Sequence, residues 1–187
     1  MTEYYLDIET EGDDPLQDRI ITIQFQQLEK GDPVGNFNIL VEWEWGEKEI
    51  IRSILEKGLL DVGWDFVPIG NRLNFDITFI VERAGKHKLI SWDPSQLKYY
   101  FFKKPMLDLW PVLVLMNRGR FQGSSLTAFS QKKDRGSLVT SLYRQGDYQS
   151  ILRYIEEERE AVLDLYREVR SVLSTLGDRR KARLTAD

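Results

Sequence analysis

The feature that most restricts the fold is a stretch near the start of the chain in which apolar and acidic residues alternate. It contains Asp7 and Glu9, with Leu6 and Ile8 at the intervening positions. Side chains alternate between the two faces of a β-strand, so this pattern predicts a strand that ends near Thr10 and carries both carboxylates on one face. Two such carboxylates can share a hard divalent cation, although an isolated acidic pair is also typical of the solvent-facing side of an amphipathic strand.

The chain has the size and apolar content of a single folded domain. Its 187 residues are 42% hydrophobic and 12% aromatic, which is enough for one substantial core. No run reaches the roughly 20 consecutive apolar residues that a membrane span needs, and the first residues are acidic in character and lack the positively charged flank of a leader. We therefore expect a soluble, cytoplasmic protein that does not contact a membrane.

Carboxylates should carry most of the chemistry, because other reactive residue types are scarce. The chain has no cysteine, which excludes disulfides, thiolate zinc sites, iron–sulfur clusters and cysteine nucleophiles. Its one histidine, His87, limits any histidine-based site to that residue. The formal net charge of −4 is not typical of a general nucleic-acid coat. It does not exclude a nuclease, because a carboxylate cluster becomes charge-reversed when it binds divalent cations.

The first half of the chain predicts strands followed by a helix. Residues 20–28 and 37–43 should complete a three-stranded antiparallel meander with the first strand, and residues 30–36 should form the loop between them. A helix over 47–57 should end at Gly58, a common stop signal. Strands first and helices later favour an α/β or α+β domain.

The second half of the chain should be mainly helical. After a short strand over 65–69, we expect helices over 76–83 and 105–116, the latter kinked at Pro111, and a long helix over 147–177.

Domain organisation follows from the lack of repeats, low-complexity tracts and interdomain linkers in the sequence. We expect one domain over residues 1–177. The charged residues after it should form a basic tail over 178–187 that is frayed or ordered only by a partner.

A second group of candidate site residues surrounds the loop after the short strand. Gly70 leads into Asn71 and Asn74, and then Phe75 and Asp76 stand at the expected helix start, where a carboxylate is favoured. Taken alone, such a loop is more often a simple helix cap with its phenylalanine in the core.

The third group lies on the long C-terminal helix. Tyr154 and Glu158 are four residues apart, so their side chains project from the same face and can point at one object. The charged run from Glu156 to Glu160 equally fits a solvated helix face.

Taken in order, the three groups resemble the tyrosine subtype of the DEDD-type 3′-5′ exonucleases. Asp-x-Glu on a strand, Asn-x-x-Asn-Phe-Asp before a helix, and Tyr-x-x-x-acid on a late helix look most like the proofreading exonuclease domain of family B DNA polymerases and its stand-alone relatives. The resemblance spans roughly residues 4–166. It implies an α/β, ribonuclease-H-like fold: a mixed five-stranded sheet, antiparallel meander first, flanked by helices.

The resemblance also implies a metal site that holds two cations, Mg²⁺ or Mn²⁺. Asp7 would bridge both cations, and Glu9 would bind the cation that activates water. Asp76 would support the second cation, and Glu158 would complete the ligand set.

The other matched residues would handle water and substrate. Tyr154 would orient the attacking water, and Asn71 and Phe75 would frame the substrate-binding loop. The family has aspartate where this chain has Glu158, whose side chain is longer by one methylene. Metal ligands tolerate only small errors in distance, so either the helix lies slightly farther back or the water-activating cation is held less well.

The implied function is hydrolysis of phosphodiester bonds at the 3′ end of single-stranded or frayed DNA by a two-metal mechanism. Two alternatives stay open. One is a catalytically weak member of the fold that binds nucleic acid or protein, suggested by Glu158. The other is an RNA-directed 3′-5′ exonuclease, because nothing in the chain visibly reads or rejects a 2′-hydroxyl. Any proofreading role would require a replication or repair protein as partner.

Scattered basic and aromatic residues add a weaker indication of nucleic-acid contact. Lysines flank His87 on both sides, and lysine pairs occur at 103–104 and 132–133. The aromatic residues at 92 and 99–102 could stack on bases. Such pairs are ordinary protein surface in most cases, and we expect most of these residues to be surface or core.

Overall fold

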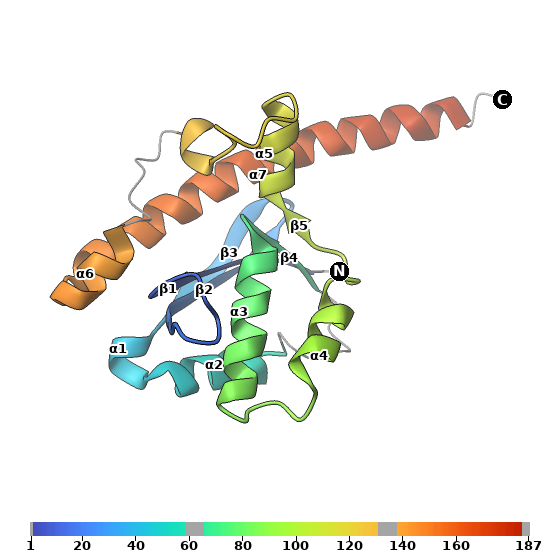
Figure 1. Ribbon diagram of the computed structural model, residues 1–187. Coiled ribbons are helices and arrows are strands. Elements are labelled where there is room, and N and C mark those ends of the chain that lie inside the picture. Colours follow the sequence, from blue (N-terminus) through green and yellow to red (C-terminus); the bar gives the residue numbers. More distant parts are fainter. Residues whose placement is uncertain (1, 59–65, 131–137, 185–187) are drawn as a thin grey trace.

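A mixed five-stranded sheet with helices on both faces forms the centre of the molecule (Figure 1). The computed structural model describes residues 2–58, 66–130 and 138–184. The strands are β1 (Thr2–Thr10), β2 (Ile20–Glu29), β3 (Asp32–Val41), β4 (Phe66–Gly70) and β5 (Leu107–Asp108). The helices are α1 (Glu42–Trp45), α2 (Glu47–Glu56), α3 (Leu73–Lys86), α4 (Pro94–Phe101), α5 (Leu109–Met116), the 3₁₀ turn η1 (Leu126–Ala128), α6 (Val139–Gln145) and α7 (Tyr148–Leu184).

The sheet has the order β3-β2-β1-β4-β5 and confirms the predicted mixed topology. β1, β2 and β3 form the antiparallel meander, whereas β4 pairs parallel to β1 and β5 pairs parallel to β4. A parallel neighbour needs a crossover, and the chain makes it through α2 before entering β4.

Each face of the sheet has its own core, as the alternation in β1 requires. Leu6 and Ile8 pack with α2, α3 and α4, whereas Tyr5 packs with α5 and α7 on the other face. Fully burying a large apolar side chain stabilises a fold by about 1.5–3 kcal/mol, so exchanging the faces of β1 would cost several such contributions.

The boundaries of β3 and α3 differ from the prediction. β3 begins at Asp32 and ends at Val41, so the expected loop is reduced to a tight turn and Trp43 belongs to α1. β3 is an edge strand, where Pro33 removes no ladder hydrogen bond that the sheet needs. α3 begins at Leu73, which places Asp76 inside the first turn instead of at the cap.

Two helices in the second half also differ from the prediction. The expected helix over 105–116 is the short strand β5 followed by α5, and Pro111 lies in the first turn, where it does not interrupt an intrahelical bond. α7 continues past Gly177 to Leu184, because a single glycine weakens a helix without ending it and the arginines and lysine that follow are good helix formers.

Other predictions were incomplete. The helices α1, α4 and α6 were not expected, although Asp93 caps α4 by accepting hydrogen bonds from the Ser95 and Gln96 amides. The first residue of the predicted 65–69 strand and the lysine pair 132–133 lie outside the described residues. Within the described ranges, no helix combines the length and apolar character that a membrane crossing demands.

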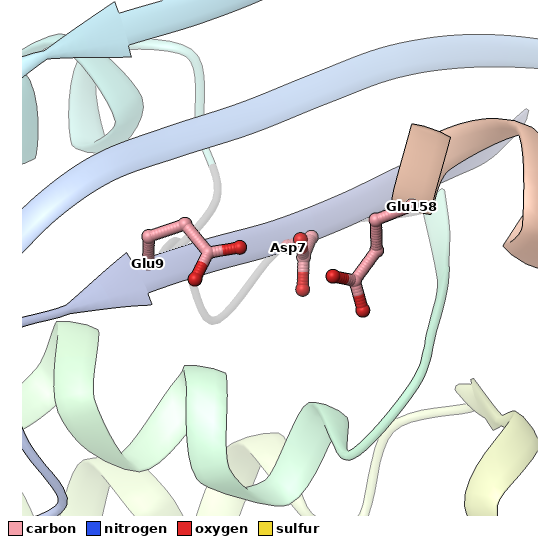
Figure 2. A group of neighbouring side chains, drawn as sticks. All are labelled: Asp7, Glu9 and Glu158. Carbon is pink, nitrogen blue, oxygen red and sulfur yellow. The ribbon is translucent and has the colours of Figure 1, made fainter. Parts of the chain in front are cut away.

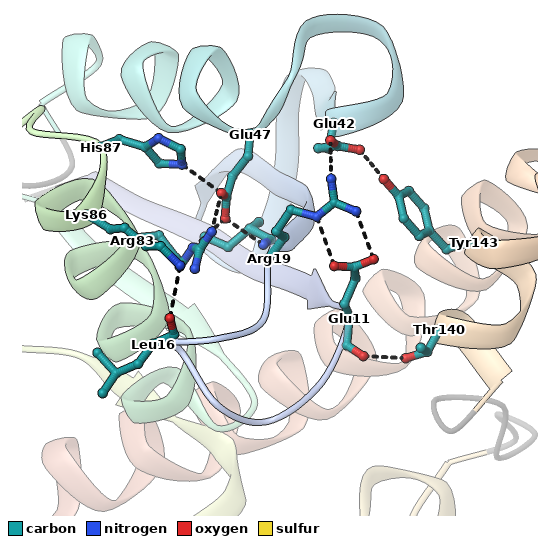
Figure 3. Close-up of polar contacts among 11 residues, drawn as sticks. Glu11, Leu16, Arg19, Glu42, Glu47, Arg83, Lys86, His87, Thr140 and Tyr143 are labelled. Atoms are coloured by element: carbon teal, nitrogen blue, oxygen red, sulfur yellow. Dashed lines mark hydrogen bonds and ion pairs between the residues drawn. The ribbon is translucent and has the colours of Figure 1, made fainter.

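A buried ion-pair network joins α2, α3 and the start of β2 (Figure 3). The Glu47 carboxylate accepts hydrogen bonds from Arg83 Nε at 2.7 Å, Arg83 Nη2 at 2.6 Å and the Ile20 amide at 2.9 Å, and lies 2.7 Å from His87 Nε2. Burial alone would raise the pKa of Glu47, but these hydrogen bonds outweigh it and lower the pKa. Glu47 and Arg83 therefore each depend on the other for a counter-charge in a buried position.

We expect Glu47→Gln to lower the free energy of unfolding by about 3 kcal/mol, because it leaves the Arg83 guanidinium buried without a counter-charge. For a chain of this length, the melting temperature should fall by roughly 6–12 °C in a thermal denaturation experiment. The matched control is Glu49→Gln on the same helix, an exposed partner of Arg52, which should change stability by less than about 1 kcal/mol. Equal effects of the two substitutions would contradict this role of Glu47.

A second polar cluster attaches α6 to the loop between β1 and β2 (Figure 3). Arg19 donates to both oxygens of Glu11, at 2.9 and 3.0 Å, and also pairs with Glu42. Tyr143 donates to Glu42, and Thr140 donates to the Glu11 carbonyl at 3.1 Å. Because α6 leads directly into α7, these contacts help to set where α7 lies relative to β1.

Candidate functional site

Carboxylates from the two ends of the chain meet at one point of the fold. Asp7, Glu9 and Glu158 each offer an oxygen atom, and these three atoms lie within 4.8 Å of one another. Figure 2 shows Glu158 reaching from α7 toward the two carboxylates of β1. The structure thus brings together three of the four predicted metal ligands. Glu158 lies some 150 residues after Asp7 in the sequence.

The sheet register leaves this part of β1 open. The pairing of β1 with β4 runs only as far as Tyr5 opposite Ile69, so Asp7 and Glu9 extend beyond the carboxyl end of β4. α3 starts beside that end, and α7 packs over the face on which Tyr5 lies. Polar groups at the carboxyl ends of parallel strands are a common position for binding sites in α/β sheets.

Asp76, in the first turn of α3, is close enough to these three carboxylates to feel their charges. Its side chain is 3% exposed, and its Oδ2 has no hydrogen-bond partner among the described residues. Burial raises the pKa of Asp76 well above its ordinary value, and the charges of Asp7, Asp108, Glu9 and Glu158 raise it further. The fourth predicted ligand therefore lies within the electrostatic reach of the other three.

Tyr154 faces the same cluster from α7. It is buried, and burial raises the pKa of its hydroxyl, with further contributions from the charge of Glu9 and from the charge and hydrogen bond of Glu158. The side chains of Tyr154 and Glu158 lie one helical turn apart, as their spacing predicts. The tyrosine is thus placed to position a small polar molecule at the carboxylates.

Two residues that the sequence analysis did not single out hold Asp7. The Tyr5 hydroxyl and Gln24 Nε2 each donate a hydrogen bond to Asp7 Oδ2, both at 3.3 Å. Tyr5 shares the face of Asp7 on β1, and Gln24 stands opposite Asp7 in the register with β2. Polar residues at positions 22, 24 and 26, with apolar residues at 21, 23 and 25, were the available signal.

The two predicted substrate-binding residues, Asn71 and Phe75, lie just before α3 and in its first turn, close to Asp76 in sequence. Asn71 is half-buried in the turn before α3, and its Oδ1 is buried without a partner among the described residues. Phe75 packs against the core and contacts Phe79 at a centroid distance of 4.9 Å. His87 belongs to the Glu47 network described above.

The donor set fits a divalent cation. All four acidic side chains offer hard oxygen ligands of the kind that Mg²⁺ and Mn²⁺ prefer. Gathering them in a largely buried position is unfavourable for their charges, as the raised pKa of Asp76 indicates. An orphaned buried carboxylate oxygen on Asp76 adds a ligand atom that no described group satisfies.

Solved structures of exonuclease I share this fold. A zinc-bound complex of E. coli ExoI with single-stranded DNA aligns with a TM-score of 0.60 and 12% sequence identity, covering 99% of this chain and 44% of that chain. A complex of E. coli exonuclease I with a dT13 oligonucleotide gives a TM-score of 0.60 at 12% identity, covering 95% and 42%. A further exonuclease I structure gives 0.58 at 12% identity, covering 91% and 41%.

At this level of identity the likeness establishes the fold, which is the ribonuclease-H-like α/β fold expected from the sequence. The chain spans less than half the length of these structures. No protein-family model and no curated protein matches the sequence. The more specific resemblance to polymerase proofreading domains stays a prediction.

Proposed function

We propose that this protein is a metal-dependent 3′-5′ exonuclease that acts on single-stranded DNA. The observation that carries the proposal is the convergence of Asp7 and Glu9 on β1 with Glu158 on α7, within 4.8 Å, beside the buried Asp76. The fold likeness supports it, because the similar structures include exonuclease I bound to single-stranded DNA. If Glu158 were only part of a solvated helix face, it would have no reason to lie beside the carboxylates of β1.

Asp7, Glu9 and Glu158 would hold one divalent cation, and Asp7 with Asp76 would hold a second. When bound, such a pair stabilises the attacking and leaving oxygens of an in-line displacement and makes a coordinated water nucleophilic. Mg²⁺ and Mn²⁺ both suit the oxygen ligands.

The protein's own groups position the reactants. Tyr5 and Gln24 fix the orientation of the Asp7 carboxylate by donating to its Oδ2. The Tyr154 hydroxyl, beside Glu9 and Glu158, would orient the water that attacks phosphorus. An ordinary tyrosine hydroxyl is protonated at neutral pH, so Tyr154 would act as a hydrogen-bonding group rather than as a base.

Glu158→Asp should lower the rate of hydrolysis by about 10-fold, because the glutamate already reaches the cluster and shortening it withdraws a ligand. The matched control is Glu157→Asp, an exposed neighbour on α7, which should leave the rate unchanged. The measurement is the initial rate of oligonucleotide degradation with Mn²⁺. A gain of activity in Glu158→Asp would instead favour the catalytically weak, binding-only alternative.

The choice of polymer is tested by comparing labelled single-stranded DNA and RNA of one sequence, with Mg²⁺ and with Mn²⁺. We expect faster degradation of DNA. A preference for RNA would move the proposal to the RNA-directed alternative, and binding without hydrolysis of either polymer would contradict an enzymatic role.

A further inference from the structure

An arginine and two aromatic rings form a stacked set outside the carboxylate cluster. The Arg72 guanidinium lies 5.8 Å from the centre of the Trp110 ring. Trp110 in turn stacks on Phe121, with ring centroids 5.8 Å apart and an interplanar angle of 27°. Phe121 is 71% exposed, so one end of this set presents an aromatic ring to solvent.

The set begins one helical turn from the buried carboxylate of Asp76. The Arg72 carbonyl accepts hydrogen bonds from the Phe75 amide at 2.8 Å and from the Asp76 amide at 3.4 Å. Asp108 Oδ1 accepts from the Arg72 amide at 2.8 Å and from the Trp110 amide at 3.0 Å. One carboxylate oxygen therefore ties the α3 start to the α5 start and holds Arg72 next to Trp110.

The backbone around Arg72 is held in a conformation that is unfavourable for most residues. Arg72 has φ of 66°, in the left-handed region, which costs a non-glycine residue about 1 kcal/mol or more. Its side chain is exposed and makes no contribution to the core. The hydrogen bond from the Arg72 amide to Asp108 helps to hold this conformation.

The loop that carries Phe121 is ordered by its own side chains. Asn117 Nδ2 donates to the Arg120 carbonyl at 3.0 Å, to the Gln122 carbonyl at 2.9 Å and to Ser124 Oγ at 3.1 Å. These bonds fix the loop while leaving Phe121 in solvent. A large apolar ring on a well-fixed loop is thus presented for contact with something outside the fold.

The positive charges on Arg72 and in the loop that carries Phe121 indicate what that contact is. Arg72, Arg118 and Arg120 are all exposed, in a chain whose net charge is −4. Cations beside flat aromatic surfaces match the phosphates and bases of single-stranded nucleic acid, since any base can stack on an aromatic ring and its backbone is polyanionic. An apolar peptide or a lipid would not call for an arginine against the Trp110 ring and two more exposed arginines in the loop that carries Phe121.

We propose that Arg72, Trp110 and Phe121 form a base-stacking site that guides a single strand toward the carboxylates. This inference rests on the proposed function. Phe121 provides the exposed stacking surface, and Trp110 packs against the Phe121 ring and holds it in place. Arg72 pairs with a phosphate close to Asp76.

A second exposed aromatic group, on and next to α4, provides the control. Tyr99 is 61% exposed and lies against Tyr100, at a centroid distance of 6.2 Å. The Lys103 ammonium already covers the Tyr99 ring at 3.9 Å. No described hydrogen bond ties this group to the carboxylate cluster, so Tyr99→Ala removes an exposed ring without touching the proposed path.

The test is equilibrium binding, by fluorescence anisotropy in EDTA at low salt, of a labelled dT oligonucleotide and of the same oligonucleotide with abasic nucleotides at its 3′ end. Phe121→Ala should weaken binding of the dT oligonucleotide about 10-fold and leave binding of the abasic one unchanged. Phe121→Trp should restore the affinity, and Tyr99→Ala should bind as the wild type does.

Three results would overturn the inference: wild-type affinity in Phe121→Ala, equal losses on both oligonucleotides, or a loss in Tyr99→Ala alone. Because EDTA removes divalent cations, this measurement does not depend on hydrolysis. A stacking site can thus be confirmed in a protein that proves inactive, and an active enzyme can be shown to lack the site.

Discussion

Asp7→Asn is expected to lower the rate of oligonucleotide hydrolysis by at least about 10³-fold, the largest effect of any single substitution in this chain. Figure 2 shows Asp7 between Glu9 and Glu158, and it would contact both cations. Asparagine keeps the size and the hydrogen-bond acceptor of the side chain but removes the charge. The loss should therefore appear in kcat and in the affinity for Mn²⁺, with the fold intact.

The same substitution should stabilise the fold when no metal is bound. Removing one of several crowded carboxylates relieves repulsion, so Asp7→Asn should melt at a higher temperature than the wild type in EDTA. Saturating Mn²⁺ should raise the melting temperature of the wild type by roughly 5–10 °C and that of Asp7→Asn much less.

The control for both measurements is Asp13→Asn, an exposed aspartate in the loop after β1. It should change neither the rate nor the response to Mn²⁺. An Asp7→Asn variant that keeps its metal response and its activity would show that the cluster is an ordinary acidic surface.

Tyr154→Phe should lower kcat by about 10²-fold and leave the affinities for Mn²⁺ and for single-stranded DNA near those of the wild type. The hydroxyl lies beside Glu9 and Glu158 and is the group that would orient the attacking water. Phenylalanine keeps the ring that packs against Ile151 and Ile155, so the helix should stay in place. Single-turnover kinetics would separate this effect from product release.

Tyr166→Phe is the matched control on the same helix. Tyr166 is also buried, but its hydroxyl bonds Glu3, away from the carboxylate cluster, and its loss should leave kcat unchanged. A Tyr154→Phe variant with full kcat would mean that the hydroxyl has a structural role only.

The main elements of the site were predictable because they follow from local geometry. A period of two residues assigns Asp7 and Glu9 to one face of β1, and a separation of four residues aligns Tyr154 with Glu158 on a helix. Both statements hold in the structure. That the two elements meet was implied only by the family resemblance, since spacing within an element says nothing of its distance from another.

The contacts that the supporting residues make were harder to predict for the same reason. Gln24 reaches Asp7 only because of the β1–β2 register, and Trp110 meets Phe121 only through the loop that follows α5. Signals for helix ends were also ambiguous. Pro111 is compatible with an interior kink or a first turn, and Gly177 with a stop or a continuing helix, and packing and neighbouring residues decide between them.

The most direct test of the central proposal is a time course of a 5′-labelled single-stranded DNA with Mn²⁺, beside the same strand carrying nuclease-resistant linkages at its 3′ end. We expect the unblocked strand to shorten stepwise into a ladder from its 3′ end, and the blocked strand to stay intact. Equal degradation of both strands, immediate release of the 5′-terminal label, or no degradation with either Mn²⁺ or Mg²⁺ would contradict a 3′-5′ exonuclease.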